Sequence, residues 1–291
     1  MKLRFLAALA AAVVCVLAAG CAGRPVRVAG RVPAADGTEI AWERRGEGAP
    51  AIVLIHCWCG NREFWRNQFD LLAKDHAVYA LDLPGHGASG RTRAEWSVAG
   101  LGHDVARFCR DLDVGRVVLV GHSMGGPVAL HAAAELGDQV VGIVAVDTLH
   151  DCEHGMTKEQ VESFAKGFDA DFEGAMRGAV ASMLPKDVDP RLSDWITRSA
   201  LATDRRAATA LMRDFANQDL VRLFESVHVP IRGINSASSP WPTNVEANRR
   251  HADYDAVVMS GVGHYPHLER PAEFDALLLR TLDELQRRAK P

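Results

Sequence analysis

Short apolar runs alternate along most of this chain with longer segments whose apolar residues recur at helical spacing, and this alternation constrains the fold more than any other feature. The runs lack alternating polar residues, which is typical of strands buried on both faces of a parallel sheet. The segments between them are long enough to be crossover helices. We therefore predict an α/β fold with a mostly parallel sheet and helices on both faces. The predicted strands are 52–55, 77–81, 117–120, 143–146 and 256–259, and the predicted helices are 64–72, 98–112 and 127–136.

One long region, 151–228, interrupts the alternation because it contains helical segments only. Thr157 and Gln160 form a capping-box pair at the start of one of them. The region is much longer than a crossover between neighbouring strands needs. We interpret it as a helical cap inserted between two parts of one core, residues 34–150 and 229–291. The alternative is a set of core helices.

The N-terminus has the pattern of an export signal. Lys2 and Arg4 precede an uncharged apolar run over residues 5–19, and small residues follow. A membrane-spanning anchor is the alternative, but a span needs about 20 apolar residues and this run is shorter. We predict a signal peptide over residues 1–20 and an exported protein.

Residues 17–21 read Leu-Ala-Ala-Gly-Cys, which resembles a bacterial lipoprotein box. In that motif the cysteine is lipidated and becomes the mature N-terminus. The resemblance implies a lipid anchor on Cys21, a tether over residues 21–33, and a periplasmic or cell-surface lipoprotein held at a membrane. Ordinary cleavage to a soluble secreted protein is the alternative, since small residues suit either peptidase.

The composition is that of a folded globular protein, with 48% hydrophobic and 24% charged residues. The formal net charge of -4 and the pI of about 6.3 offer no broad positive field that would hold phosphates. We therefore expect no nucleic-acid partner. A small neutral or apolar substrate is easier to accommodate.

The sharpest chemical signal is the segment 117–126, which reads VVLVGHSMGG. A buried strand runs into Gly-x-Ser-x-Gly, and a helix is predicted from residue 127, which is the context of a nucleophile elbow. Such a turn is strained and packed against neighbouring strands, so bulky side chains cannot flank the serine. We predict that Ser123 is thereby held out into a catalytic site.

With this segment, the chain resembles the α/β-hydrolase superfamily over residues 36–282, and three further segments match the family in the expected order. Residues 56–61 (HCWCGN) follow a strand where the family has its oxyanion loop. Residues 82–89 (DLPGHGAS) resemble its next strand-end turn, and residues 263–264 (GH) follow the last core strand. The resemblance implies the α/β-hydrolase fold and a serine hydrolase that needs no cofactor.

The resemblance also implies an oxyanion hole. An ester carbonyl attacked by a serine oxygen becomes a negatively charged tetrahedral group, which fixed N–H donors stabilise. The family supplies these donors from backbone positions that correspond to Met124 and Trp58. Cys57 stands where the family usually has glycine, and this is a departure from its pattern.

A base and an acid complete the implied triad. His264 follows the last strand where the family keeps its catalytic imidazole, and His267 is the alternative base. The acid is often found after the strand that corresponds to 231–235, but no carboxylate follows there. Asp147 ends the preceding strand, from which some members of the superfamily supply the acid, so we predict this role for it. Its alternative role is that of a cap or turn former, and Asp82 is a poorer candidate for the acid because its setting is commonly structural in the family.

Four cysteines follow the predicted signal and tether: Cys57, Cys59, Cys109 and Cys152. Export would permit disulfides, and a bridge from Cys152 to Cys57 or Cys59 is our hypothesis because these loops should meet near the active site. No second ligand pair stands at a zinc-site spacing, so we expect no metal. Residues 85–90 match Gly-x-Gly-x-x-Gly, but no helix opens directly after them, so we expect no dinucleotide cofactor.

We predict hydrolysis of an ester or related acyl bond through an acyl-serine intermediate. Carbon–carbon bond hydrolysis, lactone opening, thioester cleavage and cofactor-free perhydrolysis use similar constellations, whereas epoxide hydrolases and dehalogenases have aspartate in place of Ser123. A non-catalytic ligand-binding protein on the same scaffold is the alternative from another class. The sequence does not indicate an oligomeric state. Apolar cap residues are expected mainly to form the cap core, with a few lining a pocket for acyl or aromatic groups: Phe164, Phe168, Phe172, Met176, Met183, Trp195, Met212 and Phe215.

Overall fold

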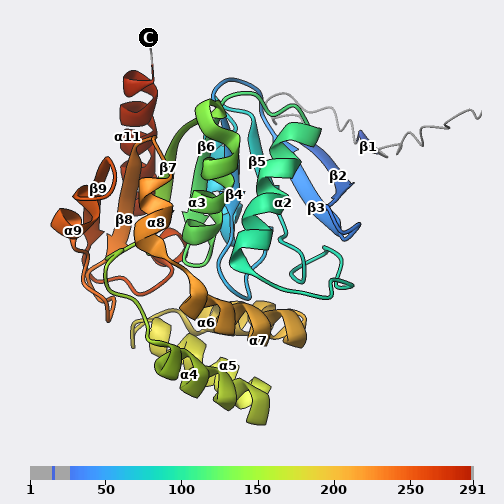
Figure 1. The fold of residues 1–291 in the computed structure, drawn as a ribbon, viewed down its shortest axis with the longest axis vertical. Helices are drawn as coiled ribbons and strands as arrows, with labels where there is room; N and C mark the ends of the chain where they lie inside the picture. Colours follow the sequence, from blue (N-terminus) through green and yellow to red (C-terminus); the bar gives the residue numbers. More distant parts are fainter. Residues whose placement is uncertain (1–14, 17–26, 290–291) are drawn as a thin grey trace, which may run out of the picture.

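The computed structural model describes residues 15–16 and 27–289, and in this part of the chain nine strands form one sheet (Figure 1). Their order is β1-β2-β3-β5-β4-β6-β7-β8-β9. The strands from β5 to β9 in this order are parallel, and β1, β2 and β3 extend one edge in antiparallel fashion. The strands are β1 (Cys15–Val16), β2 (Arg27–Pro33), β3 (Glu39–Arg45), β4 (Ala51–Ile55), β5 (Val78–Leu81), β6 (Val117–His122), β7 (Val140–Val146), β8 (Ile231–Ser236) and β9 (Tyr254–Met259).

The apolar runs predicted to be strands are confirmed as β4, β5, β6, β7 and β9. Sequence analysis did not assign β2 and β3. The residues of β2 alternate between exposed positions and partly or fully buried ones, so this strand has no continuous apolar run. Residues 27–33, which we expected to belong to the N-terminal tether, pair with β3 along their full length.

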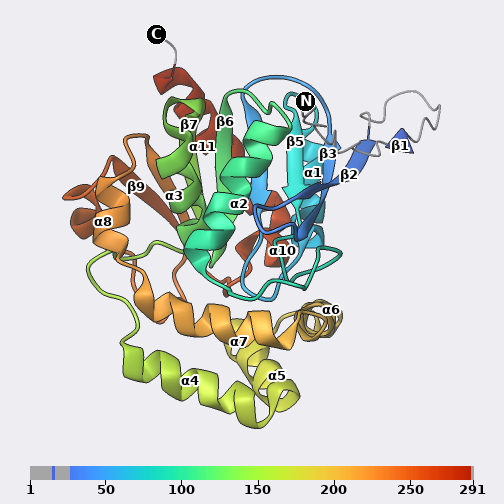
Figure 2. The same cartoon turned by 45° about the vertical axis from the view of Figure 1, so that its right-hand side comes forward.

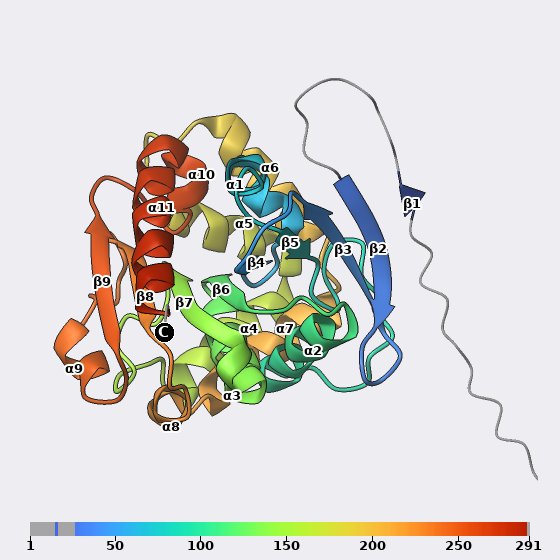
Figure 3. The same ribbon diagram turned by 90° about the horizontal axis from the view of Figure 1, so that it is seen from above.

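Helices cover both faces of the sheet, with α2, α3 and α8 on one face and α1, α10 and α11 on the other (Figure 3). Alternate side chains of β4 serve the two layers: Val53 and Ile55 pack on the first face, and Ile52 and Leu54 on the second. Each is fully buried and contributes about 1.5–3 kcal/mol through loss of apolar surface from water. The core helices are α1 (Arg66–Leu72), α2 (Val98–Asp111), α3 (Gly125–Leu136), α8 (Leu220–Glu225), α9 (Val245–Arg249), α10 (Pro266–Glu269) and α11 (Pro271–Arg288), with short 3₁₀ turns η1 (Arg62–Trp65) and η2 (Gly137–Gln139).

Four helices form a separate layer over the carboxyl ends of the parallel strands (Figure 2). Each begins at a residue whose side chain accepts a hydrogen bond from a backbone N–H of the first turn. The predicted capping box of Thr157 and Gln160 is present at the first of these helices. By contrast, α8 packs against α3 of the core. The cap helices are α4 (Lys158–Ala170), α5 (Phe172–Met183), α6 (Pro190–Leu201) and α7 (Arg205–Asp214), and η3 (Phe215–Asn217) follows them.

The predicted signal peptide, except for residues 15–16, and the predicted lipidation site Cys21 lie outside the described residues. Within residues 15–16 and 27–289, none of the helices combines the length and the apolar character that a bilayer span requires.

Candidate active site

The turn after β6 holds Ser123 in a strained conformation. Its φ angle is +53°, in the left-handed region that residues with a side chain rarely adopt. The glycines around it are required by close packing: a Cβ atom on Gly121 would lie 2.1 Å from the carbonyl oxygen of Gly125, and one on Gly125 would lie 2.5 Å from that of Ile55. The Ser123 N–H is fixed by the Val146 carbonyl oxygen at 3.0 Å. Strand, turn and the helix α3 therefore present the serine at the carboxyl end of the sheet.

His264 and Asp147 are joined by a short hydrogen bond at the same end of the sheet. Nδ1 of His264 donates to Oδ2 of Asp147 over 2.6 Å. The other carboxylate oxygen accepts the Ser236 N–H at 2.8 Å, and Asp147 is only 3% exposed. A charge-assisted contact of this kind fixes the ring orientation and leaves Nε2 free to exchange a proton.

The loop that carries His264 is fixed at several points that the sequence did not reveal. The His264 N–H donates to the Met183 carbonyl of the cap helix α5 at 2.8 Å, and its own carbonyl accepts from Nε2 of His122 at 2.7 Å. The Glu269 carboxylate accepts the N–H groups on both sides, those of Gly263 and Tyr265, at 2.6 and 2.8 Å. These contacts hold the imidazole loop rigidly between the core and the cap.

His150 is a further residue that sequence analysis did not assign. Its Nε2 atom lies 3.6 Å from Oδ1 of Asp147, so this carboxylate lies between two imidazoles. Burial lowers the pKa of His150 below the usual value for histidine, which keeps this second ring neutral near pH 7. The only sequence signal for it was its place three residues after Asp147.

Ser123, Asp147 and His264 line one cavity of about 890 Å³ between the core and the cap. Within the described residues, the Ser123 hydroxyl makes no hydrogen bond, and catalytic hydrogen bonds are often long before substrate binds. Most of the wall on the cap side is apolar. It includes Phe164, Met176, Ala179, Val180, Met183, Leu184, Met212 and Phe215.

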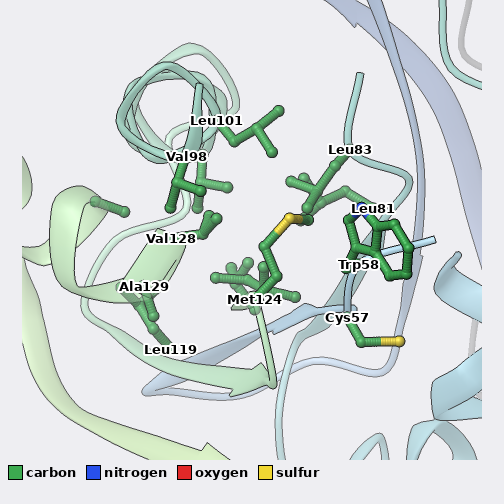
Figure 4. Packing of buried hydrophobic residues seen from close by; sticks show 14 of the residues in the cluster. Cys57, Trp58, Leu81, Leu83, Val98, Leu101, Leu119, Met124, Val128 and Ala129 are labelled. Carbon is green, nitrogen blue, oxygen red and sulfur yellow. The ribbon is translucent and has the colours of Figure 1, made fainter. Parts of the chain in front are cut away.

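The two residues implied as oxyanion donors, Trp58 and Met124, lie in the same buried cluster around the strand ends (Figure 4). Neither backbone N–H donates to an acceptor within the described residues. Trp58 is followed by Cys59, whose φ of +56° turns the loop back toward the core. Two buried imidazoles support this loop: His56 donates from Nδ1 to the Cys57 carbonyl at 2.8 Å, and Nε2 of His86 accepts the Cys59 N–H at 3.3 Å.

His267, the alternative base, is buried away from any carboxylate. Its ring is fully buried and stacks on Trp65 with centroids 4.7 Å apart. Neither ring nitrogen has a hydrogen-bond partner within the described residues. Burial lowers the pKa of His267 to about 3, so the ring is a neutral packing group at physiological pH.

The hypothesis of a disulfide from Cys152 to Cys57 or Cys59 is wrong for this structure, in which all four described cysteines away from the N-terminal strand are free thiols. The loops do face one cavity, but they follow different strands: Cys57 follows β4 and Cys152 lies beyond β7, with β6 between them. The Cys152 N–H donates to Oδ1 of Asn248, which belongs to α9 and not to the loop of Cys57. Burial raises the pKa of Cys57 to about 12 and that of Cys152 to about 11, so both remain protonated.

Within residues 15–16 and 27–289, no group of three or more histidine, cysteine or acidic side chains could hold a metal ion. The segment 85–90 forms a turn in which Ser89 donates to the Asp82 carbonyl at 2.5 Å, and the next helix begins only at Val98. The Arg62 guanidinium also pairs with the Asp82 carboxylate. Through these contacts of Asp82, the turn is fixed at the strand ends beside the site.

The doubly covered parallel sheet, the strained serine turn and the histidine–aspartate pair are features of the α/β-hydrolase fold. The chain belongs to the α/β-hydrolase family, whose model, described as alpha/beta hydrolase fold, matches residues 50–230. Its relatives include esterases that are similar over most of both chains. One of them, the pimeloyl-[acyl-carrier protein] methyl ester esterase of Photorhabdus laumondii subsp. laumondii, is 26% identical over 269 residues, covering 82% of this chain and 95% of the relative.

Two further comparisons define the extent of the similarity. The dihydrolipoyllysine-residue acetyltransferase component of the acetoin cleaving system of Cupriavidus necator is 37% identical over 111 residues, but these cover 38% of this chain and 30% of the relative. The chain thus spans about a third of the length of several curated relatives that it matches. The esterase EaEST from Exiguobacterium antarcticum has the same fold, with a TM-score of 0.79 at 21% identity over 87% of this chain and 98% of that chain.

Proposed function

We propose that this protein is a serine hydrolase that cleaves an ester or related acyl bond through an acyl-Ser123 intermediate. The observation that carries the proposal is the hydrogen-bonded pair of His264 and Asp147 in the cavity that also contains the strained serine. A serine hydroxyl is a poor nucleophile until a base removes its proton. An imidazole oriented by a buried carboxylate is suited to that task.

In the first half of the reaction, Oγ of Ser123 attacks the substrate carbonyl carbon while its proton passes to Nε2 of His264. The carbonyl electron pair moves to oxygen, and the N–H groups of Trp58 and Met124 stabilise the resulting charge. The intermediate collapses, the bond to the leaving alcohol breaks, and the imidazolium protonates the leaving oxygen. Water then repeats the sequence on the acyl-enzyme and releases the carboxylic acid and free Ser123.

The walls of the cavity favour an apolar acyl group as substrate. Its cap side presents phenylalanine, methionine and valine side chains, whereas Arg270 is the only lysine or arginine among the described residues that line it. A carboxylate or phosphate on the acyl chain would lose its hydration against these apolar side chains, and among the lysine and arginine side chains it could pair only with Arg270. The methyl ester named for the Photorhabdus relative is in keeping with an ester substrate. Lactones and thioesters present the same carbonyl chemistry and are the other candidates.

A fluorophosphonate probe tests the proposal most directly, because it reacts with an activated serine whatever the natural substrate. We expect labelling of the wild type and none of the Ser123→Ala variant. A folded wild type that takes up no label would instead favour a non-catalytic binding protein. A panel of p-nitrophenyl esters, an N-acyl lactone and an acyl thioester would then rank the bond types by kcat/KM.

The proposed base also predicts the dependence on pH. Protonated His264 cannot accept the serine proton, so the neutral ring is the active form. We expect kcat/KM to rise tenfold per pH unit on the acid side and to level off once the ring is neutral. A kcat/KM that does not change with pH would contradict an imidazole base.

A further inference from the structure

The side chain of Trp58 reaches from the loop after β4 into the cap. Its indole Nε1–H donates to the Ala208 carbonyl oxygen of α7 over 2.8 Å in a buried contact. Its ring meets Phe168 of α4 edge-on, with centroids 5.2 Å apart, and lies 6.5 Å from Phe164. One side chain of the core loop thus contacts two cap helices, and its own backbone N–H is the donor proposed above for the oxyanion.

The hydrogen bond from the indole to the Ala208 carbonyl oxygen can form without breaking a backbone hydrogen bond of α7. A carbonyl oxygen has two lone pairs, and only one is needed for the bond within α7. Met212, one turn further along α7, lines the cavity, as do Phe164 and Trp58 itself. A ligand that binds against the cap side of the cavity therefore contacts the helices that hold the indole ring.

The backbone around Trp58 is held to the core on both sides. The next residue, Cys59, is fixed in the left-handed region and donates its N–H to His86 of the core. On the other side, the Cys57 carbonyl, which shares a peptide group with the Trp58 N–H, accepts hydrogen bonds from Nδ1 of His56 at 2.8 Å and from the Gly60 N–H at 3.0 Å. Because these anchors come from the core, the indole ring is the contact through which the cap acts on this peptide group.

We infer that Trp58 is a positioning residue that couples the cap to the oxyanion hole, so that an apolar acyl group bound against Phe164 raises turnover as well as affinity. This inference rests on the serine-hydrolase function proposed above. Its physical basis is that an oxyanion donor acts only when it is closely aligned with the developing charge. An acyl group that is too short to contact the cap cannot improve the alignment of the Trp58 N–H with the developing charge.

Two variants separate this coupling from a general loss of cap packing. Trp58→Phe keeps an aromatic ring and removes the indole donor. The matched control Arg91→Met removes a different hydrogen bond between core and cap, from Nη2 of Arg91 to the Ala202 carbonyl at 2.9 Å, and leaves the oxyanion loop untouched. Both variants lose one hydrogen bond of similar length between core and cap, and Arg91→Met also loses the 3.5 Å hydrogen bond from Nη2 of Arg91 to the Gly87 carbonyl within the core.

The measurement is kcat and KM for p-nitrophenyl acetate and p-nitrophenyl octanoate. We expect Trp58→Phe to lower kcat for the octanoate by about tenfold, less than the 10²–10³ for removal of a donor, with KM changed less than about twofold. The wild type should turn over the octanoate faster than the acetate, and the variant should lose most of this difference. Arg91→Met should keep the wild-type ratio. The inference would be overturned if the ratio of kcat for the octanoate to kcat for the acetate were the same in Trp58→Phe and Arg91→Met.

Hydrogen–deuterium exchange gives a readout that does not depend on turnover. Peptides covering residues 56–65 should exchange faster in Trp58→Phe than in the wild type or Arg91→Met, and unchanged exchange would also overturn the coupling. If wild type and Ser123→Ala hydrolyse esters equally, the proposed function fails, while the exchange result still decides the contact. Should Trp58→Phe not fold, Phe168→Leu loosens the ring and keeps the hydrogen bond, and we expect a change in the same direction of about threefold; no change there would overturn the inference.

Discussion

The Oδ2 atom of Asp147 accepts a hydrogen bond from Nδ1 of His264 over 2.6 Å, although the two residues are 117 positions apart in the chain. Asp147 itself sits at the end of β7 with a φ of +43°, a conformation that costs free energy and persists only where the surroundings demand it. Its N–H is fixed by the Ile234 carbonyl and its Oδ1 by the Ser236 N–H. The neighbouring strand β8 thus aims this carboxylate, while supplying no acid of its own.

The first prediction concerns this carboxylate. Asp147→Asn should lower kcat by about 10⁴-fold, because an amide does not stabilise the imidazolium and favours the wrong tautomer. The far-UV and near-UV circular dichroism spectra should stay those of the wild type. Asp151→Asn is the control: Asp151 also lines the cavity, but its carboxylate pairs with Asn244 and His154, so kcat should change less than about tenfold. Near-normal turnover of Asp147→Asn would assign the acid to another residue.

The second prediction separates the two histidines of the last loop. His264→Ala should abolish fluorophosphonate labelling with little loss of stability, because its ring is partly exposed in the cavity. His267→Ala should retain labelling but lower the free energy of unfolding by about 1–3 kcal/mol, since it removes a fully buried ring from its stack on Trp65. Urea denaturation and probe labelling of both variants check this. The reverse pattern would make His267 the base.

The third prediction is a loss of stability at acid pH. Burial lowers the pKa of His267 and His86 to about 3 and that of His56 to about 4, whereas unfolded histidine titrates near 6.5. Between about pH 6 and 4, the unfolded chain therefore binds protons that the folded chain does not. Stability should fall as pH falls, by up to about 1.4 kcal/mol per pH unit for each such ring.

Replacement of one ring tests this proton linkage. Between pH 4 and 6, His267→Leu should reduce the slope of the unfolding free energy against pH by the amount that corresponds to one bound proton, about 1.4 kcal/mol per pH unit. Phe274→Leu is the matched control, because it changes a buried ring 5.7 Å from His267 that carries no titrating group, and its slope should stay that of the wild type. An unchanged slope in His267→Leu would mean that this ring is protonated in the folded state.

The fourth prediction compares two glycines. Gly121→Ala should abolish activity and destabilise the fold, because its Cβ would meet the Gly125 backbone at 2.1 Å and force the serine turn apart. Gly178→Ala, within the cap helix α5, meets nothing within 4 Å and should stabilise the protein by about 0.4–1 kcal/mol. Thermal unfolding of both variants measures the difference. An active, stable Gly121→Ala enzyme would show that the turn relaxes.

The fifth prediction concerns export. We propose that Cys21 is lipidated and holds the enzyme at a membrane surface, on the basis of the charged start, the apolar run and the Leu-Ala-Ala-Gly-Cys pattern. Metabolic labelling with a fatty acid should mark the wild type and leave Cys21→Ala unlabelled. The activity of both should be equal after detergent extraction. Absence of label in the wild type would indicate ordinary cleavage or no cleavage.

The layered fold followed from local sequence patterns. Continuous apolar runs predicted the buried parallel strands β4 to β7, because a strand covered on both faces has no polar side, and the cap helices begin at residues that can cap them. Ser123 was also recognisable from a local pattern, because the glycines that its turn needs lie within two residues of it. The edge strand β2 escaped, because a half-exposed strand has no such run.

Contacts between distant segments were decided only by the tertiary structure. The sequence offered two candidate acids, Asp147 and Asp82, and two candidate bases, His264 and His267. Only the register of β7 beside β8 and the loop after β9 brings Asp147 onto His264 and leaves His267 buried on Trp65. The free state of the cysteines and the contact of Trp58 with α7 also depend on how separate segments pack. Local patterns specify elements through short-range sterics and burial, whereas the pairing of side chains far apart in the chain depends on how those elements pack together in three dimensions.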